Sequence, residues 1–273
     1  LYGSRAHVLA QLDDHFASAV DGMTSMICIV GEAGSGKTEL MRAARNRLSE
    51  KGALCVSADL HAAGESHGAG VLETIAQLTT AFLGEERKTL ARLRETLERS
   101  LHPNAGLLTK VVAPLSQLLG LHQEPPTLDG QVADRRLVLT LLRCLDAFAQ
   151  EKRLVLSFDG LPQADLLTLD TLEHLLSPTT APRRGIMLLA ALRPEELQEN
   201  PKLAALLQDR ERDGNMFSIR LPPLDAGEIR DVLEELGETP SQDMVTTAEA
   251  LRDRTRGNPL FLQHFLRTLL ATG

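Results

Sequence analysis

One stretch constrains this chain more than any other. An apolar run ends at Gly31 and is followed by G-E-A-G-S-G-K-T over residues 31–38, which fits the pattern G-x-x-x-x-G-K-[ST]. The flanks predict a strand before it and a helix after it. Glycines let the backbone amides turn inward, and a helix opening at Lys37 directs the positive end of its dipole to the same place. The stretch therefore predicts a phosphate-binding loop.

In such a loop Lys37 would reach the β- and γ-phosphates, and the Thr38 hydroxyl would hold Mg²⁺. The residues that we expect to bind the nucleotide here are Gly31, Ala33, Gly34, Ser35, Gly36, Lys37, Thr38 and Glu39. The motif predicts the class of ligand but not the reaction.

Composition narrows the class of protein. The 273 residues suffice for one large domain, or a large one and a small one. A net charge of −8 argues against broad contact with nucleic acid or an anionic membrane. No apolar run reaches the roughly 18 residues of a membrane span. The cysteines Cys28, Cys55 and Cys144 lie in apolar runs without C-x-x-C spacing, which favours buried thiols in a reducing compartment. We expect a cytoplasmic protein, and a domain of a longer chain because the sequence opens at Leu1.

Apolar strand patterns alternate with helical patterns along most of the chain. The predicted strands are 26–30, 53–58, 154–159, 186–192 and 216–221. This order predicts an α/β fold, the three-layer P-loop NTPase sandwich with a five-stranded parallel sheet covered on both faces. Helical patterns alone follow Pro222-Pro223. We therefore expect a nucleotide-binding domain over residues 1–222 and a helical lid over residues 223–273.

A mostly helical insertion is predicted at about residues 60–132. Its helical patterns cover 71–83, 85–101 and 106–119, with a kink or break at Pro114, and a further amphipathic helix spans 134–150. His61 and His67 lie in a loop rich in glycine, alanine and serine. A metal site there is the weaker hypothesis, because no carboxylate or cysteine pattern accompanies the pair, and a solvent-exposed loop is expected.

Two residues at strand ends extend the site. Asp159 ends a buried strand, where a carboxylate typically holds the Mg²⁺ shell opposite the threonine, although it could instead cap a turn. Arg193 follows the strand 186–192 and could face the γ-phosphate or be a surface arginine. Ligands of parallel sheets bind at the carboxyl ends of the strands, so these residues and Gly31 should converge. The candidate catalytic residues are Lys37, Asp159 and Arg193, and the candidate metal ligands are Thr38 and Asp159.

These motifs occur together in a known class. With L-Y-G near the start, L-V-L-S-F-D, A-L-R, and R-T-R-G-N-P-L-F-L near the end, the sequence resembles the STAND class of the AAA+ superfamily. These are predicted-ATPase domains of large multidomain signalling kinases, cyclases and regulators. The resemblance implies a molecular switch in which ATP, bound with Mg²⁺ between sheet domain and lid, sets a state that flanking effector and sensor domains read. It places Tyr2, Gly3 and Pro259 around the adenine and gives Arg193 the γ-phosphate sensor role.

Two positions depart from the class. Relatives usually carry arginine directly after the glycine of L-Y-G, whereas this chain has Ser4 and then Arg5. Relatives also carry a second acid after the strand-end aspartate, which helps activate the attacking water, and this chain has Gly160. Losing a general base typically costs about a hundredfold to ten-thousandfold in rate. We therefore expect tight binding with slow or no hydrolysis, and we interpret nearby Asp165 as a helix cap.

Alternatives stay open at this point. The chain could be a competent ATPase that uses a partner-supplied residue, since Arg210 and Arg212 lie where oligomeric AAA+ proteins place an arginine finger, although a plain surface role is favoured. Self-association would then be required. An origin-recognition-like DNA-loading ATPase shares the architecture but needs a basic face or a winged helix, and neither is evident. A GTPase is disfavoured because no N-K-x-D motif follows.

Overall fold

A five-stranded parallel sheet forms the centre of the molecule. The computed structural model describes residues 6–18, 24–61, 68–177, 186–236 and 242–272. The strands lie in the order β2-β3-β4-β1-β5, and each neighbouring pair is parallel. Their bounds are β1 Ser25–Val30, β2 Leu54–Asp59, β3 Leu154–Asp159, β4 Ile186–Leu192 and β5 Met216–Arg220. The predicted α/β fold with a five-stranded parallel sheet is confirmed.

Burial explains why the strands read as continuous apolar runs. Every residue of β4 is buried, and β3 is buried up to Asp159, because helices cover both faces of the sheet. The edge strand β5 differs, since Met216 and Ile219 are buried while Phe217, Ser218 and Arg220 are exposed. Because consecutive side chains point to opposite faces, this edge strand is partly exposed on both faces of the sheet.

Helices pack on both faces. One face holds α1 (Ala6–Ser18) and α2 (Lys37–Glu50), whose apolar side chains join those of β1 and β4 in one cluster. The other face is covered by helices that share a larger cluster with the sheet. These are α3 (Ala69–Leu83), α7 (Gly130–Glu151), α8 (Leu166–Leu175) and α9 (Pro201–Arg212). Short 3-10 turns, η3 (Leu161–Gln163) and η4 (Pro194–Gln198), follow β3 and β4.

The helical insertion shares the core of the sheet. Besides α3 it holds α4 (Arg87–Leu101), α5 (Ala105–Thr109) and α6 (Ala113–Leu119), and residues from all four join the large cluster. The helical pattern over 106–119 is broken as predicted, because Pro114 lies in the first turn of α6, where its missing N–H costs no hydrogen bond. The helix predicted from 134 in fact begins at Gly130. Its first turn is exposed and therefore carried no apolar period.

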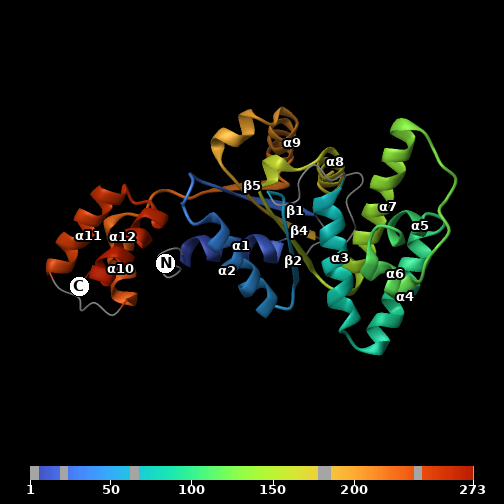
Figure 1. The fold of residues 1–273 in the computed structure, drawn as a ribbon, viewed down its shortest axis with the longest axis horizontal. Coiled ribbons are helices and arrows are strands. Elements are labelled where there is room, and N and C mark those ends of the chain that lie inside the picture. The colour runs from blue at the N-terminus through green and yellow to red at the C-terminus, as the bar shows by residue number, and fades with distance from the viewer. Residues whose placement is uncertain (1–5, 19–23, 62–67, 178–185, 237–241, 273) are drawn as a thin grey trace.

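The last three helices have a small core of their own. They are α10 (Ala226–Glu235), α11 (Gln242–Thr255) and α12 (Pro259–Thr272), called the lid below. Leu224, Ile229, Met244, Leu251 and Leu262 are among the residues of this core. Figure 1 shows the lid at one end of the molecule and the insertion at the other, with the sheet between them.

Among the described helices, none has the length and apolar character needed to cross a bilayer. The thiols of Cys28 and Cys144 are buried and that of Cys55 is half-buried, and none forms a disulfide. Burial raises the pKa of Cys28 to about 12 and that of Cys55 to about 11, so these thiols are protonated at neutral pH.

Candidate nucleotide-binding site

The phosphate loop, residues 31–38, joins the carboxyl end of β1 to the first turn of α2. Gly36 lies directly before that helix with φ 88°, and among the described residues no side chain caps the helix. Uncapped amides at a helix start have no intrahelical partner and attract anions. The loop therefore offers donors for a phosphate, as the motif predicted.

Lys37 lies across the loop. Its Nζ donates to the carbonyl oxygens of Gly31 and Glu32, at 2.8 Å each. Burial, and after it the nearby Arg193 guanidinium, lower the pKa of Lys37 below its usual value. An anion between these two cations would relieve that repulsion, which is the electrostatic arrangement a phosphate site needs.

Thr38 and Asp159 meet at the same edge. The Thr38 hydroxyl donates to Asp159 Oδ2 at 2.9 Å, although the two residues come from different elements of the sheet domain. A hydroxyl and a carboxylate are the oxygen donors that Mg²⁺ takes alongside phosphate and water. These two residues therefore fit the predicted metal. The described residues contain no cluster of three or more acidic, histidine or cysteine side chains that would form an all-protein metal site.

Arg193 is the first residue after β4. Leu192 pairs in register with Val30 of β1, which brings Arg193 beside the loop. Its backbone amide donates to Glu196 Oε2 at 2.9 Å, and its Nε lies 3.7 Å from Glu196 Oε1. The side chain is exposed and held at the site edge by this glutamate.

The other predicted loop residues divide into two groups. Ser35 is buried, and Ala33 and Gly34 face the lid. Glu39, in contrast, is exposed and pairs with Arg42 one turn further along α2 at 2.7 Å. Tyr2 and Gly3 lie outside the described residues, as do Ser4 and Arg5.

The lid is bonded directly to the phosphate loop. Asn258 Nδ2 donates to the carbonyl of Ala33 at 2.8 Å, and the Leu260 amide donates to the carbonyl of Gly34 at 3.2 Å. Gly34 has φ +76°, and a Cβ there would meet Asn258 Oδ1 at 2.7 Å and Leu260 Cβ at 2.9 Å. The glycine is thus required by the lid as well as by the turn. Sequence reasoning selected Pro259 from this segment and missed Asn258, whose place before a proline is typical of a helix cap.

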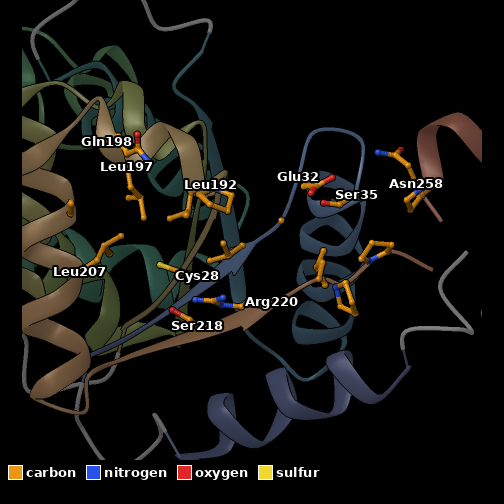
Figure 2. A pocket seen from close by; sticks show the side chains of 18 of the residues that line it. Cys28, Glu32, Ser35, Leu192, Leu197, Gln198, Leu207, Ser218, Arg220 and Asn258 are labelled. Carbon is orange, nitrogen blue, oxygen red and sulfur yellow. The ribbon is translucent and has the colours of Figure 1, made fainter. Parts of the chain in front are cut away.

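A groove of about 1820 Å³ opens beside the loop. Figure 2 shows Cys28 and Ser218 on its floor, Leu207 of α9 on one wall, and Glu32 of the phosphate loop on another. Pro259 also lines it, at the lid end. The larger part of its lining is apolar, and polar side chains are spread along it, including Glu32 of the loop, Glu211 of α9, Arg220 of β5 and Arg254 of the lid.

Comparison with known proteins agrees with this geometry. The model of the family described as "AAA ATPase domain" matches residues 2–189. The chain belongs to this family. As a P-loop ATPase domain of the AAA+ class it binds nucleotide, and the family implies ATP with Mg²⁺.

A solved structure has the same fold as this AAA ATPase domain. This chain is similar to the crystal structure of Cdc6p from Pyrobaculum aerophilum, with a TM-score of 0.51 and 16% sequence identity. The match covers 94% of this chain and 59% of that one, so the AAA ATPase domain spans a little over half the length of that protein. At this identity the likeness concerns the fold alone. No curated protein matches the sequence.

Asp165, Arg210 and Arg212 of this AAA ATPase domain have partners that explain them. Asp165 caps α8 as expected, because its carboxylate accepts from the amides of Leu167, Thr168 and Gly68. Arg210 and Arg212 pair within their own segment, at 2.9 Å with Asp213 and 3.1 Å with Asp209. Both arginines are therefore paired with acidic side chains of their own segment, residues 209–213.

Proposed function

We propose that this chain is the nucleotide-dependent switch module of a larger signalling protein, of the STAND class, with slow or no ATP hydrolysis. Residues 1–222 would form the nucleotide-binding part and residues 223–273 the lid. Flanking effector and sensor domains would read the orientation of the lid. The observation that carries the proposal is the hydrogen bonding between the lid and the backbone of the phosphate loop.

This contact links nucleotide state to lid position. The amides of the loop would bind the phosphates, while the carbonyls of Ala33 and Gly34 accept from Asn258 and Leu260. A shift of the loop on phosphate binding must therefore alter the lid contact. A ligand shifts a conformational equilibrium only by its differential interaction with the two states, and this contact supplies such a difference.

The groove suits the nucleoside. It is lined by Gly31, Pro222, Asn258, Pro259 and Phe261, which come from the loop, the segment before the lid and the lid itself. A base placed there would touch both bodies at once. The groove supports Pro259 as the adenine contact. The proximity of Lys37 and Arg193 supports them as the phosphate contacts, and the hydrogen bond between Thr38 and Asp159 supports these two as the Mg²⁺ ligands.

Slow hydrolysis is supported by what stands near Asp159. Gly160 follows it and has no side chain that could take a proton, and the carboxylate of Asp165 is engaged in capping. No acidic side chain therefore stands at position 160, directly after Asp159, to activate water. The switch would turn over on the timescale of nucleotide exchange rather than of rapid catalysis.

The first experiment measures affinity for ATP, ADP and GTP with Mg²⁺, together with phosphate release. Lys37→Ala should weaken ATP binding roughly tenfold to a hundredfold, the usual effect of losing a charged hydrogen bond. Lys110→Ala, a surface lysine paired with Glu124 in the insertion, is the matched control and should change nothing. Equal ATP affinity in all three proteins would contradict the nucleotide site.

The second experiment tests the switch itself. Hydrogen exchange at the Leu260 amide should differ between the ADP state and the state with Mg²⁺ and a non-hydrolysable ATP analogue. The reason is that this amide donates to Gly34 in the loop. Identical exchange in the empty, ADP and ATP-analogue states would contradict a nucleotide-dependent lid.

A further inference from the structure

The place of the missing acid is filled by a histidine. Gly160 has φ +75°, and a Cβ on it would lie 2.6 Å from His61 Cδ2, 2.7 Å from His61 Nε2 and 2.9 Å from His61 Cγ. The imidazole therefore occupies the volume in which a side chain at position 160 would begin. We infer that His61 stands in for the second acid of the site and orients and deprotonates the attacking water in the slow hydrolysis of ATP. This inference rests on the proposed nucleotide site.

Backbone hydrogen bonds hold the segment that carries His61. Asp59 of β2 pairs in register with Asp159 of β3, and the Leu60 amide continues the ladder by donating to the carbonyl of Asp159 at 2.9 Å. The His61 amide then donates to Asp59 Oδ1 at 3.0 Å. His61 thus directly follows the tip of β2, which is bonded to the tip of β3 at Asp159, the residue whose carboxylate Thr38 contacts.

The two arrangements exclude each other. An acid at position 160 would need a left-handed backbone, which costs a side-chain-bearing residue energy, and would overlap the ring. Gly160 and His61 are therefore compatible with each other, because the missing side chain at position 160 leaves room for the ring. His61 is an exposed residue, so water can reach it.

The chemistry balances with the residues present. A neutral imidazole has one nitrogen that accepts a proton. As the oxygen of water bonds to the γ-phosphorus, its proton passes to that nitrogen, and the bond from the γ-phosphorus to the bridging oxygen breaks with its electron pair leaving on ADP. The proton then returns from the exposed ring to solvent. Phosphate and ADP are the products, and no other reactant is needed.

The test measures Lys37-dependent phosphate release and ATP affinity in His61→Ala, His61→Gln and the parent chain. His61→Ala should lose about tenfold or more of the release, the lower range for removal of an acid–base group, with ATP affinity unchanged. His61→Gln should keep more release than His61→Ala, because an amide can still orient water. His122→Ala, an exposed histidine of the insertion, is the matched control and should leave release unchanged.

A second variant displaces the ring without removing it. Gly160→Ala places a Cβ within 2.6 Å of the ring, so it should lower release in the same direction as His61→Ala. Unchanged release in His61→Ala would overturn the inference, as would a loss of ATP affinity that accounts for the loss of release. Absence of Lys37-dependent release in the parent chain would also overturn it, while intact ATP binding would leave the proposed switch standing.

Discussion

The phosphate loop has two neighbours that contact it in different ways. On the lid side, Asn258 and Leu260 bond to backbone carbonyls of Ala33 and Gly34. On the sheet side, the Thr38 hydroxyl meets the carboxylate of Asp159. The lid contact depends on the path of the loop backbone, whereas the sheet contact joins two side chains that we propose as Mg²⁺ ligands. We therefore propose that the first contact controls lid position and that the second belongs to the chemistry.

If the two contacts have separate roles, substitutions on the two sides should have different effects. Changes on the lid side should alter lid position and affinity but leave the rate of phosphate release per bound nucleotide unchanged. Changes near Asp159 should do the reverse. The variants that test this separation of lid position from phosphate release are expected to differ in the size of their effects.

The largest effect is expected from Gly34→Ala. The new Cβ would meet the lid at 2.7 Å and 2.9 Å in a left-handed backbone. We expect lid docking in the nucleotide-free protein to weaken by about 2–3 kcal/mol, measured as faster exchange of the Leu260 amide. Gly36→Ala is the control, because Gly36 has φ +88° but, among the described residues, nothing lies within 4 Å of its Cβ position. Equal exchange at Leu260 in both variants would show that backbone strain alone explains the loss.

Asn258→Ala should have an intermediate effect. It removes the donor to Ala33 and the side-chain oxygen that accepts from the Leu260 amide at 3.0 Å. We expect the free energy of unfolding to fall by about 1–2 kcal/mol, measured by calorimetry. Asn258→Asp keeps the acceptor and loses the donor, so it should fall between the parent and Asn258→Ala. A change in phosphate release per bound nucleotide would break the proposed separation.

Asp165→Asn should have the smallest effect on function. The cap of α8 weakens, so stability should fall by about 1 kcal/mol in denaturant unfolding, with phosphate release unchanged. Asp129→Asn is the control, since Asp129 also precedes a helix but makes no cap hydrogen bond. Slower phosphate release in Asp165→Asn would instead make Asp165 part of the chemistry.

Much of the site could be predicted from sequence. The loop over residues 31–38 is contiguous, and its glycines, lysine and threonine act through local backbone geometry. Asp159 could be located because parallel strands end at a common edge, and the register of β2, β3, β4 and β1 brings it to that edge. The helix start at Gly130 was missed because an exposed first turn has no apolar period.

What could not be predicted are contacts between segments distant in the chain. His61 was interpreted as part of a solvent-exposed loop, because nothing near it in sequence shows that its ring lies against Gly160. Asn258 and Ala33 are likewise far apart in sequence. Such pairs depend on how whole elements pack, and no local pattern encodes them.

The sequence by itself therefore determined the sheet, the phosphate loop and the candidate residues for phosphate and metal binding, because strand burial and loop geometry follow from neighbouring residues. The tertiary structure alone decided that the lid bonds to the loop and that a histidine fills the space beside Gly160. The first contact forms only when the lid packs on the phosphate loop, and the second only when the tips of β2 and β3 come together. Steric exclusion then limits which residues Gly34 and Gly160 can be replaced by.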